Sequence, residues 1–122
     1  MSESKWPDWS HLPGPVKRVL SQAQTLADNF KHPRVTAAHI MCALTHISPH
    51  EVLRVVLAST VADVNLTIHH LLSDENLAGM DKVLQNARGL SPGGSIELGH
   101  LIKAAARACG FPMRPAGSKT TP

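Results

Sequence analysis

The stretch VTAAHIM at residues 35–41 decides the fold of this chain, because it returns 61 residues later as IELGHLI at residues 96–102. A shorter block precedes each copy: VLSQA at residues 19–23 before the first, and VLQNA at residues 83–87, 64 residues further on, before the second. Both copies therefore keep the order helix, turn, helix, with a connecting loop that is three residues shorter (64 minus 61) in the second copy. A duplicated helical unit buries its apolar face against its neighbour. The repeat predicts a scaffold that presents a surface, rather than a catalytic pocket.

Apolar residues at intervals of three and four predict six helices. Pro15 suits the first turn of the first helix, Thr36 and Asp63 should cap the second and the fourth, and Gly110 should follow the sixth. The expected fold is an all-α bundle of about six helices, built from a duplicated helix-turn-helix unit. The predicted helices cover residues 16–30, 37–47, 49–59, 64–72, 80–90 and 98–109.

The domain organisation follows from the places where proline and polar residues gather. Residues 1–15 hold three prolines and should form an irregular leader. Residues 16–110 form the predicted domain, with repeat one over about 16–72 and a partial repeat two over about 77–110. Residues 111–122 combine much proline with few apolar side chains, so we expect a flexible tail.

Composition limits the class of protein. The chain has 122 residues, 43% of them apolar and 17% charged, which suits one compact domain. It shows neither a secretory signal nor an apolar run of the ~20 residues that span a bilayer, so we expect a soluble, cytoplasmic protein without a membrane partner. The formal charge is +3, but Lys and Arg are spread along the chain, as on a solvated surface. Cys42 and Cys109 fall inside predicted helices, where we expect reduced, buried thiols.

Both tryptophans, Trp6 and Trp9, lie in the leader. Side chains of this size seldom stay in water without a use. They either fold back onto the domain, which general burial preferences favour, or dock a partner. The second interpretation makes Trp6 and Trp9 candidate partner-binding residues.

With the paired blocks described, the chain resembles the Clp N-terminal domain, also called the Clp R domain. The resemblance rests on a first helix with a central alanine, Ala23, followed by the pattern apolar-Thr-x-x-His-apolar-apolar, in which Thr36 and His39 hold the polar positions. Glu97 and His100 stand at the matching positions of the second copy. The resemblance covers about residues 16–110.

The resemblance implies two pseudo-symmetric repeats and a role at the front of Clp ATPases, the AAA+ unfoldases and disaggregases of chaperone and proteolysis systems. Their N-domains bind substrate proteins or adaptors and pass them to the ATPase ring. The chain departs from the family in three ways. Its second copy has two predicted helices in place of four, no ATPase follows, and Ala38 and Gly99 replace a glutamate that reads phosphoarginine in some Gram-positive members. We therefore do not expect phosphoarginine as a ligand.

His39 and His100 stand three residues after Thr36 and Glu97. From there an imidazole nitrogen reaches the backbone groups of the first helical turn, while the ring packs between repeats. We predict a structural role for these four residues rather than ligand binding.

The two family helices that the second copy lacks should leave apolar surface uncovered. This surface would hold Leu98, Leu101 and Ile102, which we take as candidate partner-binding residues. Such a face predicts a homo-oligomer, or a partner that completes the fold.

Other groups of residues give weaker evidence for a metal site or for catalysis. The adjacent His69 and His70 diverge by about 100° on a helix, and Pro49 separates His46 from His50, so we expect no metal and no other cofactor. Nothing resembles a strained nucleophile turn, so we expect no catalytic residues and no enzyme.

The sequence thus predicts a non-enzymatic protein-interaction module that binds substrate proteins, peptides or adaptors, with a Clp ATPase among its potential partners. One alternative is a stand-alone regulator of a separate Clp ATPase or protease. Another is a helical DNA-associated protein with Lys17, Arg18, Lys82 and Arg88 on one stripe. The helices expected after residues 36 and 96 begin with too many apolar residues to read bases, so we do not expect nucleic acid as a partner.

Overall fold

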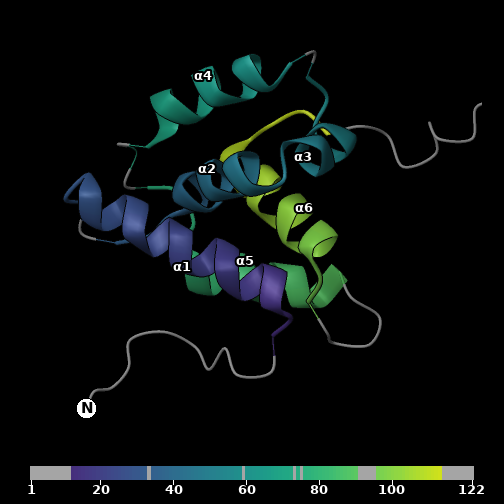
Figure 1. Cartoon of the computed structure of the whole chain (residues 1–122), viewed down its shortest axis with the longest axis horizontal. Helices are drawn as coiled ribbons and strands as arrows, with labels where there is room; N and C mark the ends of the chain where they lie inside the picture. Colours follow the sequence, from purple (N-terminus) through teal and green to yellow (C-terminus); the bar gives the residue numbers. More distant parts are fainter. Residues whose placement is uncertain are drawn as a thin grey trace, which may run out of the picture.

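The computed structural model describes residues 12–113 apart from residues 33, 59, 73, 75 and 91–95. The described residues form six helices, and their only extended pairings are two isolated bridges, so the predicted all-α bundle is confirmed (Figure 1). The helices are α1 (Gly14–Asn29), α2 (Ala37–Ile47), α3 (Pro49–Val55), α4 (Val61–Leu71), α5 (Met80–Leu90) and α6 (Leu98–Cys109).

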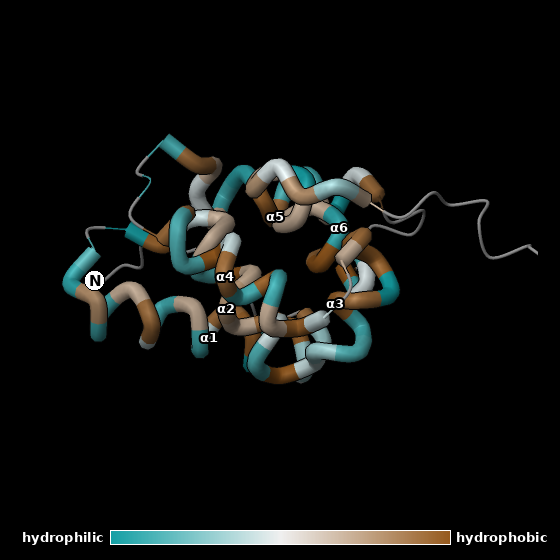
Figure 2. The backbone as a smooth tube through the Cα atoms, turned by 90° about the horizontal axis from the view of Figure 1, so that it is seen from above, coloured by the Kyte–Doolittle hydropathy of each residue, from teal (hydrophilic) through white to brown (hydrophobic). Residues whose placement is uncertain are grey.

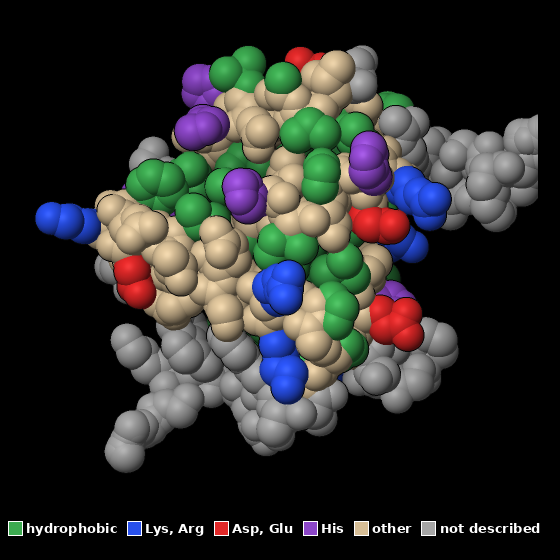
Figure 3. All heavy atoms as spheres, viewed as in Figure 1, with side chains coloured by type: hydrophobic (Ala, Val, Ile, Leu, Met, Phe, Trp, Pro, Cys, Tyr) green, Lys and Arg blue, Asp and Glu red, His purple; other side chains and the backbone are tan. Residues whose placement is uncertain are grey.

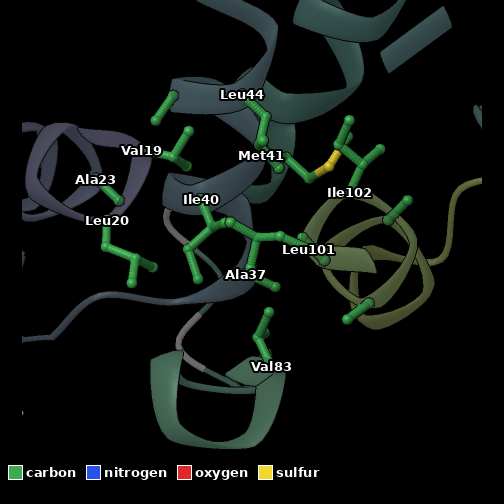
Figure 4. Close-up of a cluster of buried hydrophobic side chains, with 14 of the residues drawn as sticks. Val19, Leu20, Ala23, Ala37, Ile40, Met41, Leu44, Val83, Leu101 and Ile102 are labelled. Atoms are coloured by element: carbon green, nitrogen blue, oxygen red, sulfur yellow. The ribbon is translucent and has the colours of Figure 1, made fainter. Parts of the chain in front are cut away.

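The two copies form the pairs α1–α2 and α5–α6, and α2 lies at the centre of the bundle. Helix α2 packs against α1, α4 and α6, while α5 packs against α6 (Figure 1). Hydrophobic residues recur among hydrophilic ones along the helices (Figure 2). At helical spacing, this pattern gives a helix one apolar stripe that can pack against its neighbours. Figure 4 shows where these stripes meet. The buried side chains there are Val19, Leu20, Ala23, Ala37, Ile40, Met41, Leu44, Val83, Leu101 and Ile102.

Helix α1 ends in a Schellman motif that fixes the direction of the following turn. The N–H of Lys31 donates to the carbonyl of Asp28 at 3.1 Å, and the N–H of His32 donates to the carbonyl of Ala27 at 2.9 Å. Lys31 adopts the left-handed conformation that this motif requires, with φ of 60°. The motif brings His32 back toward the start of α2.

A short antiparallel bridge joins the two copies. The N–H of Ala37 donates to the carbonyl of Ala78 at 2.8 Å, and the N–H of Met80 donates to the carbonyl of Val35 at 3.2 Å. Thr36 and Gly79 are the bridged pair. We call this bridge the inter-copy joint. It ties the first turn of α2 to the first turn of α5.

The side chain of Arg34 lies against Gly79. The guanidinium Nη2 of Arg34 donates to the carbonyl of Leu77 at 2.7 Å. A Cβ at position 79 would lie 2.8 Å from Nη1 of Arg34, closer than real Cβ contacts allow. Glycine therefore leaves the space in which the arginine closes over the joint.

Two expected helix boundaries were wrong. Helix α3 ends at Val55 rather than near residue 59, because Val56 is extended and bridges Met113. Helix α4 is capped by Thr60 rather than Asp63, since the Thr60 hydroxyl accepts the N–H of Asp63 at 3.2 Å. A backbone bridge therefore ends α3 early, and a side-chain cap three residues before Asp63 starts α4 early.

The limits of the domain also differ from those expected. Leu12 is buried and α1 already begins at Gly14, so the packed domain starts before residue 16. At the other end, Phe111 is buried and the N–H of Leu57 donates to the carbonyl of Pro112 at 2.8 Å. The prediction of a tail from residue 111 was wrong for this segment, because one aromatic side chain and two backbone contacts suffice to hold it. Residues 114–122 lie outside the described residues, as does the leader up to residue 11.

Candidate protein-interaction site

Both copies begin their second helix with the same histidine cap. The N–H of Thr36 donates to Nδ1 of His39 at 2.9 Å, and the N–H of Glu97 donates to Nδ1 of His100 at 3.1 Å. In return, the side chains of Thr36 and Glu97 accept the backbone N–H of the two histidines. This is a capping box in which histidine replaces the usual glutamate or glutamine. All four residues thus take part in the two caps.

The cap also determines the tautomer of each ring. Because Nδ1 accepts a backbone N–H, its lone pair is engaged, and a neutral imidazole must carry its proton on Nε2. Neither His39 nor His100 then keeps a free nitrogen lone pair for a metal ion or for abstracting a proton. Chemistry at either residue would first have to break a helix cap.

His39 is buried, with 1% of its surface exposed, whereas His100 is half-buried. The Nε2–H of His39 donates to Nδ1 of His32 at 2.8 Å, and the two rings meet edge to face with centroids 5.0 Å apart. Burial, and secondly the proximity of His32, lower the pKa of His39 to about 4. His39 is therefore neutral at pH 7.

The predicted apolar face on the second copy is not there. Leu101 and Ile102 are completely buried, so they cannot bind a partner, and Leu98 is partly buried against the core. Helix α6 buries this face against α2, α3 and α5. Its exposed positions are Gly99, Lys103 and Arg107.

The two cysteines are free thiols, as expected, although both are half-buried rather than fully buried. Burial raises the pKa of the Cys42 thiol and raises that of Cys109 to about 12. Since the thiolate is the nucleophile, neither cysteine is activated at neutral pH.

An open hollow of about 460 Å³ lies where α1 begins and α2 ends. Gly14, Pro15 and Ile47 form its largely apolar wall, and Arg18 supplies its charge. Arg18 is exposed and makes no hydrogen bond or ion pair with the described residues. Figure 3 shows Lys and Arg side chains over the start of α1, next to hydrophobic ones. Reasoning from sequence alone missed this hollow, because it is formed by residues from the ends of two helices.

Large exposed apolar side chains lie elsewhere, on separate elements. Phe30 is 45% exposed just after α1, Leu57 is 52% exposed after α3, and Leu66 is 63% exposed on α4. Phe30 lies beside His32, with ring centroids 5.5 Å apart. Apolar residues that are scattered singly in this way are common on soluble proteins and do not define a binding site.

The described residues offer no group of three or more His, Cys, Asp or Glu that could hold a metal ion. None of the described helices has the length and apolar character needed to cross a membrane. Trp6 and Trp9 lie outside the described residues, so their predicted partner role stays a prediction. Comparisons with protein-family models, with curated proteins and with solved structures gave no match.

Proposed function

We propose that this protein is a non-enzymatic protein-interaction module of the Clp N-domain type, which binds an extended segment of a substrate or adaptor protein. The observation that supports this proposal most directly is the use of both motif histidines as helix caps. The residues that carry the resemblance thus build the scaffold, and the outward surface is left for recognition. The hollow where α1 begins and α2 ends combines an apolar wall with Arg18, a cation that has no partner among the described residues.

The charge of Arg18 and the apolar wall together indicate which kind of segment the hollow would bind. Arg18 suits a carboxylate, and Ile47 with Pro15 suits an apolar side chain, so the bound segment should carry an acidic residue close to an apolar one. Burying about 100 Å² of apolar surface contributes about 2.5 kcal/mol. An exposed ion pair adds at most about 1 kcal/mol, so binding should be weak and reversible.

The proposal is tested by fluorescence anisotropy with labelled β-casein, a disordered acidic protein that serves as the probe. The intact chain should bind it, and Arg18→Glu should weaken binding roughly tenfold, which is about 1.4 kcal/mol. Arg107→Glu makes the same charge change on the exposed face of α6 and serves as the matched control. No binding by the intact chain, or equal loss in both variants, would contradict the proposal.

A pull-down with the full chain as bait distinguishes the other two functions. Capture of an AAA+ ATPase, together with altered degradation by that machine when the chain is added, would favour the stand-alone regulator. Capture of nucleic acid alone would favour the DNA-associated protein. Against DNA binding, the first turn of α2 is buried and cannot enter a groove.

A further inference from the structure

Among the described residues, the two histidine caps differ in how many ring nitrogens form hydrogen bonds. His100 engages Nδ1, on the N–H of Glu97. His39 engages both nitrogens, since Nδ1 accepts the N–H of Thr36 and Nε2–H donates to Nδ1 of His32. A second proton on His39 would place an Nδ1–H opposite the N–H of Thr36 at 2.9 Å, and the Thr36 hydroxyl oxygen, 3.1 Å from Nδ1, would be the one nearby group of the cap able to accept it. The neutral ring is therefore the form that satisfies both neighbours.

His39 also lies beside the inter-copy joint. Thr36, whose N–H it accepts, is the bridged partner of Gly79. Directly after Thr36, the N–H of Ala37 makes the 2.8 Å hydrogen bond to Ala78. Loss of the cap would therefore release the first turn of α2 and the bridge together. In the part of the chain that the structure describes, the cap on α6 has no such bridge beside it.

We propose that His39 is an acid-sensitive latch: a proton on its imidazole opens the inter-copy joint and exposes the apolar start of α2, while α5 and α6 stay paired. The exposed segment would include Ala37 and Ile40, which are completely buried when the latch is closed. The device is independent of the hollow near Arg18 and of its proposed occupant.

The surroundings of the His39 ring determine whether acid favours the open or the closed form of the joint. Burial lowers the pKa of His39 first, and His32 from the turn after α1 lowers it further, to about 4. Among the described residues, no carboxylate from a helix packed against α2 offsets these two causes. In an opened joint the ring would return toward its ordinary pKa of 6.5. Falling pH between these two values therefore favours the open form.

Amide hydrogen exchange of the full chain tests the latch at the two N–H groups of the joint, Ala37 and Met80. After correction for intrinsic exchange rates, their protection should fall about twentyfold between pH 7 and pH 5, while that of α6 should not. His39→Gln keeps an acceptor for the cap but cannot titrate, so its protection should stay level. His100→Gln is the matched control and should keep the pH dependence of the parent chain.

Two results would overturn the latch: level protection of Ala37 and Met80 in the parent chain, or an equal fall in His39→Gln. The NMR titration of the His39 ring in the parent chain is a second measurement that needs no variant. The ring should stay neutral in the closed form at pH 6, whereas protonation with an ordinary midpoint in the folded chain would refute the proposal.

Discussion

The α1–α2 and α5–α6 pairs start from the same pattern and differ in what surrounds it. Position 38 is a buried alanine and position 42 a half-buried cysteine in the first copy, and the matching positions of the second are the exposed Gly99 and Lys103. Helix α4 packs against α2, and the described residues provide no counterpart of α4 for α6. A repeat can thus lack covering helices without exposing its core, provided that its outer face becomes polar.

The largest expected effect tests whether the two cores are equivalent. Ile40 and Leu101 hold matching positions and are both completely buried. Ile40→Ala and Leu101→Ala should each lower the free energy of unfolding by about 3 kcal/mol, because each leaves a cavity. Leu66→Ala, on a side chain that is 63% exposed, should cost less than about 0.5 kcal/mol. Urea denaturation measures all three. A small loss at Leu101 would show that α6 is only loosely packed.

The pH dependence of global stability should come mainly from the first copy. The pKa of His39 is lowered to about 4 in the folded chain, so its contribution is fully present above 6.5 and is lost as pH falls from 6.5 toward 4. The full difference is about 3 kcal/mol, from 1.36 kcal/mol for each pKa unit. Urea midpoints at pH 7 and pH 4.5 should converge in His39→Gln. Unchanged pH dependence in that variant would assign the effect to other groups.

Removal of the two caps should have unequal cost. His100→Ala loses one exposed cap, worth about 1 kcal/mol. His39→Ala loses a buried cap and its bond to His32, and it leaves a cavity, so it should cost about 1 to 2 kcal/mol more. Thermal unfolding of the two variants beside the parent chain gives the comparison. Equal losses of stability in the two variants would mean that burial of His39 does not increase the stability that its cap contributes.

The smallest effects come from two glycines. Gly99 matches Ala38 of the first copy, and a Cβ there would meet nothing within 4 Å, so Gly99→Ala should stabilise the chain by about 0.5 kcal/mol. Gly79→Ala should instead destabilise it by less than about 1 kcal/mol, because the flexible end of Arg34 must shift and its bond to Leu77 is weakened. Denaturation midpoints should therefore shift in opposite directions. A shift of the same sign would remove the role assigned to Arg34.

The sequence predicted the helices and the histidine caps because these depend on local spacing. Thr36 and His39 lie three residues apart, within one helical turn. Features that depend on distant pairing escaped prediction. Arg34 meets Leu77, a contact over 43 positions, and the hollow combines Gly14 with Ile47.

The burial of Leu101, Ile102 and Phe111 was missed for a related reason. Their apolar character was read correctly, but a single sequence does not reveal which helix covers them. Helices α2 and α3, both from the first copy, pack against α6, so helices of one copy cover the apolar face of the other. Counting the helices of each repeat separately therefore underestimated how much of α6 would be covered.

The left-handed backbone of Lys31 has a consequence for engineering the chain. Helix α6 ends with Gly110 at φ of 84°, where glycine meets no steric penalty, whereas α1 ends with a lysine at φ of 60°. A side chain in this region carries a strain of about 1 kcal/mol. Lys31→Gly would relieve that strain, and it would raise the melting temperature without touching the core, the caps or the hollow.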